Sequence, residues 1–263
     1  MTAPLAFITG ASSGIGQALA LRFHQGGYRL ALVARRSEVL QAWVAAQAWS
    51  AQQAQAQQVR VYAADVRQAA SITAAGRDCM AAQGLPDVVV ACAGLSLGMD
   101  TAEFADLDVM RQIYETNNLG TAATFQPFVR AMCERRSGRL VGIASVNGIR
   151  GIPGHGAYCS SKAAVISYCE SLRGECRPFG VKVVTLSPGY VKTPLTRDNP
   201  YNMPFAMEPS AFADRAFQTI EAGASYRVIP WQMGVLAKLL RVLPNAVFDR
   251  MLAGRPRKKR QGE

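Results

Sequence analysis

Short apolar runs alternate along the chain with longer segments in which apolar residues recur at helical spacing. The runs are rich in β-branched residues and cover Leu5–Thr9, Leu30–Ala34, Val59–Ala63, Asp87–Ala91, Arg139–Ala144, Val181–Leu186 and Arg227–Pro230. Strands this apolar are typical of a parallel sheet that helices cover on both faces. Their alternation with helices predicts βαβ units with right-handed crossovers. We therefore predict a doubly wound α/β domain with a mostly parallel, seven-stranded sheet.

Two segments differ in character from this alternation. Residues 41–58 are dominated by Ala and Gln, which predicts a peripheral helix with an exposed side. Helical apolar spacing runs from Trp231 to Leu243, Pro244 interrupts it, and Asn245 can cap a second helix. We expect this C-terminal helical extension, residues 231–252, to pack on its own domain or on a sister subunit; a membrane surface is the alternative. Residues 1–263 are interpreted as one domain, because no repeat or linker divides them.

Composition fits a globular protein. Of the 263 residues, 49% are apolar and 18% charged, which is enough to form one large core. The N-terminus shows no basic and apolar leader, and no stretch approaches the ~20 apolar residues of a membrane span. We therefore expect a cytoplasmic protein whose six cysteines are reduced.

The net charge of +11 is partly local, because five basic residues fall within 255–260. We expect the tail, residues 254–263, to be disordered and mainly solubilising. Attraction to anionic lipid, nucleic acid or an acidic partner is the alternative, and weak peripheral membrane contact would combine the tail with the extension. No nucleic-acid partner is expected.

A glycine-rich turn follows the first apolar run, with the sequence Thr9-Gly10-Ala11-Ser12-Ser13-Gly14-Ile15-Gly16. Between a strand and a helix, such a turn lets backbone N–H groups approach a pyrophosphate at the positive helix end. The residues predicted to bind a dinucleotide are Gly10, Ser12, Ser13, Gly14, Ile15 and Gly16. A glycine turn without a ligand is the alternative.

The second run ends in Arg35 and Arg36, where an NAD enzyme places an acid that holds the ribose 2′-hydroxyl. A guanidinium pairs bidentately with a 2′-phosphate, which an acid would repel. The two arginines therefore favour NADP(H) over NAD(H), unless one of them is merely exposed. At the end of the third run, Asp65 and Val66 are placed to hold the adenine. The Asp65 carboxylate could accept a hydrogen bond from the adenine amino group.

Tyr158 and Lys162 are four residues apart and share one face of a helix. A nearby ammonium favours phenolate, so we expect Lys162 to lower the tyrosine pKa from its usual ~10. Ser145 ends a predicted strand, and its hydroxyl could polarise a substrate carbonyl. In reduction, a hydride would attack the carbonyl carbon while Tyr158 protonates the oxygen. An ordinary amphipathic pair is the alternative.

Over about residues 5–230 the chain resembles the short-chain dehydrogenase/reductase family. The resemblance rests on the glycine-rich turn, Asp65-Val66, Ala93-Gly94, Asn117, Ser145, Tyr158-Cys159-Ser160-Ser161-Lys162 and Ser187-Pro188-Gly189. It implies a Rossmann-type fold, an enzyme acting on CH–OH or C=O groups, and a homodimer or homotetramer. It also implies that Asn117 holds a water that connects Lys162 to solvent as a proton relay. The further cofactor contacts that it implies are Ala93, Gly94, Tyr158, Lys162, Pro188, Gly189, Val191 and Thr193.

One position departs from the family pattern. Cys92 stands where the family usually has an asparagine whose side chain braces neighbouring strands. A small and often buried cysteine predicts lost hydrogen bonds rather than lost chemistry.

The substrate is expected to be a hydrophobic carbonyl compound or alcohol. Residues 194–209 combine four prolines with apolar side chains and predict a lid that closes over the site. Leu95, Leu97, Ile149 and Ile152 add apolar character. We therefore expect an NADP-preferring oxidoreductase. The alternatives are a catalytically idle NADP-binding regulatory or scaffold protein, and a membrane or nucleic-acid surface binder that uses the basic tail.

Overall fold

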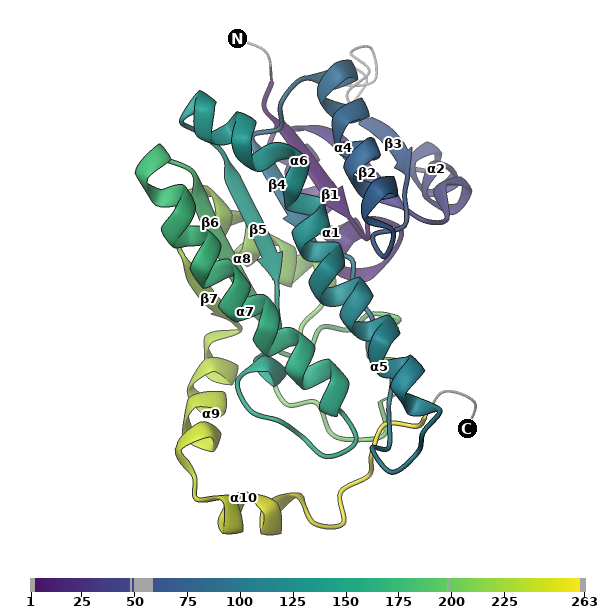
Figure 1. Cartoon of the computed structure of the whole chain (residues 1–263), viewed down its shortest axis with the longest axis vertical. Coiled ribbons are helices and arrows are strands. Elements are labelled where there is room, and N and C mark those ends of the chain that lie inside the picture. The colour runs from purple at the N-terminus through teal and green to yellow at the C-terminus, as the bar shows by residue number, and fades with distance from the viewer. Residues whose placement is uncertain (1–2, 48, 50–58, 198, 261–263) are drawn as a thin grey trace.

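The structure is a computed structural model that describes residues 3–47, 49, 59–197 and 199–260. Its centre is a seven-stranded, wholly parallel sheet in the order β3-β2-β1-β4-β5-β6-β7 (Figure 1). The strands are β1 (Leu5–Thr9), β2 (Arg29–Ala34), β3 (Val59–Ala63), β4 (Val88–Ala91), β5 (Arg139–Ile143), β6 (Lys182–Pro188) and β7 (Tyr226–Ile229). The predicted doubly wound sheet is confirmed.

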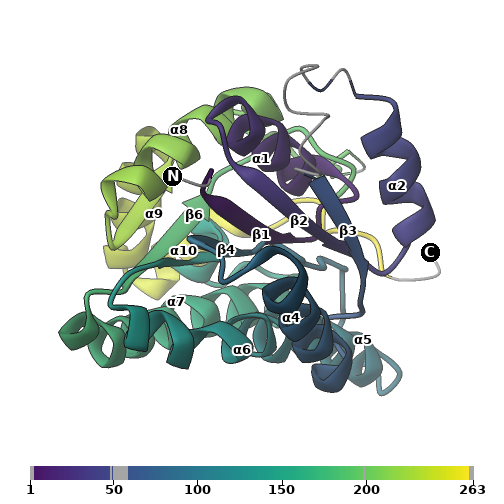
Figure 2. The ribbon, with the colours of Figure 1, turned by 90° about the horizontal axis from the view of Figure 1, so that it is seen from above.

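Helices cover both faces of the sheet. Figure 2 shows α1 (Gly14–Gln25), α2 (Ser37–Ala45) and α8 (Pro209–Ala222) on one face, and α4 (Ala69–Gln83), α6 (Gly120–Arg135) and α7 (Gly156–Cys176) on the other. A shorter helix, α5 (Asp106–Tyr114), precedes α6 through a π-helical turn at Glu115–Leu119. Short 3-10 turns occur at Val146–Gly148 and Arg177–Phe179. Of the helix expected over residues 41–58, α2 forms the beginning, while residues 48 and 50–58 lie outside the described residues.

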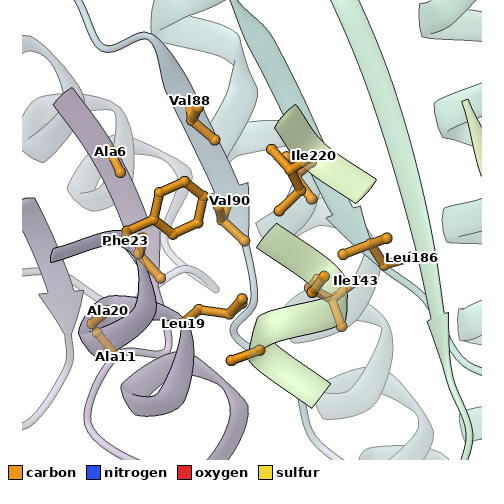
Figure 3. Close-up of a cluster of buried hydrophobic side chains, with 14 of the residues drawn as sticks. Ala6, Ala11, Leu19, Ala20, Phe23, Val88, Val90, Ile143, Leu186 and Ile220 are labelled. Atoms are coloured by element: carbon orange, nitrogen blue, oxygen red, sulfur yellow. The ribbon is translucent and has the colours of Figure 1, made fainter. Parts of the chain in front are cut away.

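Two hydrophobic cores follow from the alternation of side chains along each strand. Ala6 of β1 faces a cluster that includes Phe23 of α1 and Ile220 of α8 (Figure 3). Its neighbour Phe7 faces the opposite cluster, where its ring lies 4.9 Å from the ring of Phe128 of α6, measured between centroids. Burial on both faces explains why the strands read as continuous apolar runs.

The position of β1 determines where a ligand can bind. The chain passes from β1 to β2 and β3 on one side and then returns to β4 on the other, so the strand order reverses direction at β1. In open α/β sheets, the loops diverge at such a switch point and leave a crevice outside the carboxyl ends of the strands.

Beyond β7, the chain forms α9 (Trp231–Val242) and α10 (Asn245–Leu252) at one end of the molecule (Figure 1). The prediction that Asn245 caps the second helix is wrong, because Asn245 is the first helical residue and its Oδ1 accepts a hydrogen bond from Arg150, at 3.1 Å. The Arg150 guanidinium also lies over the Phe248 ring. Among the helices of the described residues, none is both long enough and apolar enough to cross a membrane.

Candidate active site

A cleft of about 570 Å³ opens at the carboxyl ends of the central strands. Ser145, Tyr158 and Lys162 line it, together with all of the residues predicted to contact the cofactor. These are Gly10, Ser12, Ser13, Gly14, Ile15, Gly16, Arg35, Arg36, Asp65, Val66, Ala93, Gly94, Pro188, Gly189, Val191 and Thr193. The structure therefore brings both predicted ends of the site into one cavity.

The turn between β1 and α1 leaves its backbone accessible. Gly10 and Gly14 have φ values of +67° and +53°, a conformation that side chains disfavour. A Cβ on Gly16 would lie 2.2 Å from the carbonyl oxygen of Gly10. Ser13 precedes α1 without capping it through its side chain, and the first turn holds no acid. These features fit a pyrophosphate bound to backbone N–H groups at the helix N-terminus.

The arginine end of the cleft is strongly basic. Arg35 and Arg36 are exposed after β2, and the Arg35 guanidinium lies 4.0 Å from the Asp65 carboxylate. The closer partner of Asp65 is Arg67, at 2.7 Å. Burial works against ionisation of Asp65, but the hydrogen bonds and charge of Arg67 hold its pKa below the usual value. Asp65 is thus ion-paired here, and its contact with an adenine stays a prediction.

Tyr158, Lys162 and Ser145 meet at the opposite end. Tyr158 and Lys162 are buried one turn apart on α7, and Ser145 lies two residues after the end of β5. The Lys162 Nζ donates a hydrogen bond to the carbonyl of Ile143, at 2.8 Å, and lies 5.8 Å from the centroid of the Tyr158 ring. The Ser145 Oγ accepts from the backbone N–H of Asn147, at 3.2 Å, which fixes the hydroxyl at the cleft wall.

The titration of this pair differs from the prediction. Burial raises the pKa of Tyr158 to about 12, although a hydrogen bond with Ser145 acts in the opposite direction. Burial also lowers the pKa of Lys162 to about 8. The expectation that Lys162 brings the Tyr158 pKa below its usual value is wrong for this structure. Both groups are removed from water, so each is shifted toward its neutral form.

Asn117 lies behind the cleft wall and is fully buried in the π-helical turn. Its Oδ1 accepts from the N–H of Leu95, at 2.8 Å, while its Nδ2 donates to the carbonyl of Leu95 and to the Ser161 Oγ, at 3.0 and 2.8 Å. A Cβ on Gly94 would lie 3.6 Å from both the Asn117 Oδ1 and the Lys162 Nζ. Asn117 therefore braces the loop after β4 against α7, and its role in a proton relay stays a prediction.

Sequence reasoning missed the role of Thr9. Its buried hydroxyl accepts from the backbone N–H groups of Cys92 and Ala93, at 3.1 and 3.3 Å, and donates to the carbonyl of Val90, at 3.4 Å. Thr9 thus braces β1 against the end of β4, where Cys92 replaces the usual asparagine. A polar residue that ends an otherwise apolar run was the available signal. Burial raises the pKa of the Cys92 thiol to about 12, which keeps it protonated at neutral pH.

The structure also corrects the expectation for the basic tail, residues 254–263. The tail was expected to be disordered, but the structure describes its residues up to Arg260, and the chain runs from α10 toward α5 (Figure 1). The Arg260 Nε donates to the Asp106 carboxylate at 2.9 Å, and the Lys258 Nζ donates to the carbonyl of Leu195 at 3.2 Å. Gly98 forms a parallel β-bridge with Arg260. The physical reason is that Asp106 is a buried carboxylate, which requires a cation. Residues 261–263 lie outside the described residues.

The apolar residues assigned to substrate divide between two hollows. Leu95 and Leu97 line the main cleft, as do residues 194–196 of the predicted lid. Ile149 and Ile152 line a neighbouring hollow, which Arg241 of α9 borders. Of the lid, residue 198 lies outside the described residues.

Comparisons with known proteins point to one family. The sequence model described as short chain dehydrogenase matches residues 4–203. An uncharacterized oxidoreductase of Myxococcus xanthus is 39% identical over 246 residues, which are 93% of this chain and 94% of that relative. Dehydrogenase/reductase SDR family member 7B of Mus musculus is 30% identical over 267 residues, covering 97% of this chain and 82% of its own length.

Solved structures share the architecture. An alcohol dehydrogenase from the archaeon Thermococcus sibiricus, complexed with 5-hydroxy-NADP, is 27% identical with a TM-score of 0.74, covering 86% of this chain and 95% of that one. A short chain dehydrogenase from Burkholderia cenocepacia, in complex with NADP, has a TM-score of 0.79 and covers 95% of this chain and 98% of that one. At 22% identity, the second likeness shows the fold alone.

Proposed function

The chain belongs to the short-chain dehydrogenase/reductase family of oxidoreductases, and from this premise we propose that it transfers a hydride between NADP(H) and the carbon of a carbonyl group or secondary alcohol. The observation that carries the proposal is the single cleft that joins the glycine turn to Ser145, Tyr158 and Lys162. Cofactor and substrate would meet there within one domain.

A nicotinamide cofactor fits the chain's own residues. The open backbone at Gly10, Gly14 and Gly16 would hold the pyrophosphate. The exposed Arg35 and Arg36 support NADP over NAD, because two guanidiniums at this end would attract a 2′-phosphate. The 5-hydroxy-NADP bound by the Thermococcus sibiricus alcohol dehydrogenase supports the same assignment.

We base the roles of Ser145, Tyr158 and Lys162 on their positions in the cleft and on the protonation of the last two. Bound NADPH would supply the hydride. Tyr158, which keeps its proton at neutral pH, would give that proton to the carbonyl oxygen, and Ser145 would share the developing negative charge. In the reverse direction, the ammonium of Lys162 would stabilise a Tyr158 phenolate and could also bind ribose hydroxyls. Asn117 would position the loop beside Lys162 and support proton exchange with solvent.

The substrate is proposed to be hydrophobic. Leu95, Leu97 and Leu195 line the cleft beside the reacting residues, and the segment from 194 to 209 would act as a lid. Since members of this family commonly oligomerise, we expect a homodimer or homotetramer.

Cofactor preference is tested by titrating the protein with NADPH and with NADH while following cofactor fluorescence. We expect NADPH to bind more than tenfold more tightly, which is about 1.4 kcal/mol. Arg35→Asp and Arg36→Ala should narrow this gap, whereas Arg173→Ala, an exposed arginine at the far end of α7, should leave it unchanged. Equal binding of the two cofactors by the unaltered protein would refute the NADP assignment.

The proposed hydride transfer is tested separately, by measuring turnover of the unaltered protein and of Tyr158→Phe. The probe substrates are acetophenone, a hydrophobic ketone, and acetone for comparison. The variant should bind NADPH as before but lose turnover by on the order of 10²–10⁴-fold. If the unaltered protein binds NADPH yet reduces no probe and oxidises no matching alcohol, the idle regulatory or scaffold function becomes the better account.

A further inference from the structure

The helix α9 exposes a stripe of large apolar side chains. Trp231, Val235, Leu239 and Val242 recur at three- and four-residue spacing, so they share one face, and Trp231 and Val242 are 65% and 77% exposed. The opposite side of α9 is already used, because Met233 and Ala237 are buried against Val146 and Val228. Packing on its own domain therefore accounts for one face of α9 and leaves the other uncovered.

The next helix continues this apolar surface. Val247 and Met251 of α10 are exposed, whereas Phe248 is buried beneath Arg150. Both helices lie at the same end of the molecule (Figure 1). We call the exposed apolar residues of α9 and α10, with the cations around them, the C-terminal face.

Cations share α9 and α10 with these apolar residues, and more follow in the tail. Lys238, Arg241, Arg250, Arg255, Arg257 and Lys259 are all exposed, and none of them forms an ion pair with a residue that the structure describes. Between positions 231 and 260 the sequence holds one acid, Asp249. The C-terminal face thus combines exposed apolar area with a large excess of positive charge.

We infer that the C-terminal face docks on an anionic membrane surface. A helix with an apolar stripe flanked by Lys and Arg lies in the plane of a lipid interface, its apolar side among the acyl chains and its cations at the headgroups. Trp231, at the start of α9, has the amphipathic ring that such interfaces favour.

Charge argues against a second copy as the occupant. In a symmetric pair, the same patch meets itself, so Lys238, Arg241 and Arg250 of one chain would meet the same cations of its partner, with Asp249 as the one acid on each side. Like charges brought together in this way oppose association. Anionic lipid neutralises the same cations. Docking of this kind would hold whether or not the chain transfers a hydride.

The test is co-sedimentation of the full chain with vesicles of phosphatidylcholine alone and with vesicles of three parts phosphatidylcholine to one part phosphatidylglycerol. We expect binding to the anionic vesicles only, weakened by added salt. Trp231 emission should shift to shorter wavelength on binding, and Trp231→Phe should remove the shift, since Trp43 and Trp49 are packed against the core.

Two kinds of variant separate the apolar contribution from the charge. Leu239→Glu should weaken vesicle binding at least tenfold, while Phe179→Glu, which alters an exposed aromatic residue after α7, should not change it. Lys238→Gln and Arg241→Gln should each weaken it about fivefold. Circular dichroism verifies that each variant is folded, and Val242→Ser replaces Leu239→Glu if that chain does not fold.

Several results would overturn the inference. These are equal binding to neutral vesicles, no binding to anionic ones, and binding that survives Leu239→Glu but disappears when residues 255–263 are removed, which would assign it to the tail alone. A dimer in analytical ultracentrifugation that Leu239→Glu converts to a monomer would identify the face as a subunit interface instead.

Discussion

The substitution Gly16→Ala tests whether the turn between β1 and α1 is as tightly built as the structure indicates. A Cβ at this position would lie 2.2 Å from the carbonyl oxygen of Gly10, 2.7 Å from its carbonyl carbon and 3.0 Å from the Cα of Ala11. All three atoms belong to the backbone, so no side chain can rotate away. To restore an ordinary contact, the turn itself must move by about 1 Å.

The expected cost has two parts. Forcing a methyl group into a well-packed site costs ~1–3 kcal/mol, while replacing glycine by alanine within a helix returns ~0.5–1 kcal/mol. The free energy of unfolding should therefore fall, by up to ~2.5 kcal/mol. Displaced N–H groups should also bind NADPH at least tenfold more weakly, because a hydrogen bond to a charged group contributes ~1.5–3 kcal/mol.

Urea denaturation and NADPH titration measure the two effects on the same sample. The matched control is Gly174→Ala, on an exposed turn of α7 where a Cβ would meet nothing within 4 Å. This control should gain ~0.5–1 kcal/mol and bind NADPH normally. Unchanged stability of Gly16→Ala would refute the steric argument. A loss of stability without a loss of NADPH affinity would refute the assignment of this turn to the phosphates.

Three further predictions concern the tail, the strand brace and the buried lysine. Gly98→Ala would place a Cβ 2.3 Å from the carbonyl oxygens of Lys258 and Lys259, so trypsin should remove the tail at least about fivefold faster, whereas Gly151→Ala, in open space, should show the normal rate. Thr9→Val should lower the free energy of unfolding by ~1–3 kcal/mol, because two half-buried N–H groups lose their acceptor, and unchanged urea denaturation would contradict this. Lys162→Met should remove the free-energy cost of burying a charged lysine, and this cost depends on pH. Folded Lys162 holds its proton with a pKa of about 8 against the usual 10.5, so the unfolded chain binds more protons between these values and the stability of the unaltered protein rises with pH there. The free energy of unfolding of the variant, measured by urea denaturation relative to the unaltered protein, should thus fall by ~3 kcal/mol between neutral pH and pH above 10.5. A difference between the two proteins that does not change with pH would exclude this cost.

The sheet could be predicted because its cause is local. Each central strand is buried on both faces, so burial leaves a continuous apolar run such as Val88–Ala91, whatever else the chain does. The cofactor end was predictable for a similar reason. Carboxyl ends of parallel strands share one edge of the sheet, so the residues that follow β1, β2 and β4 had to lie near one another.

The tail could not be predicted, because its cause is distant. Arg260 is held by Asp106, which lies 154 residues away and becomes a buried carboxylate only in the folded chain. A run of basic residues without periodicity carries no sign of such a partner. The titration of Tyr158 is a similar case. Spacing showed that Lys162 shares its helix face, but not that burial would raise the pKa of Tyr158.

The opposite shifts of Tyr158 and Lys162 bear on the direction of the proposed reaction. Burial lowers the pKa of Lys162 to about 8 and raises that of Tyr158 to about 12, so both groups keep their protons at neutral pH. A phenolate beside an ammonium, which oxidation of an alcohol requires, is therefore absent from the free protein at neutral pH. A protonated tyrosine beside an ammonium is present in the neutral pH range. Of the two directions, reduction of a carbonyl is the one for which the free site already holds the required protons.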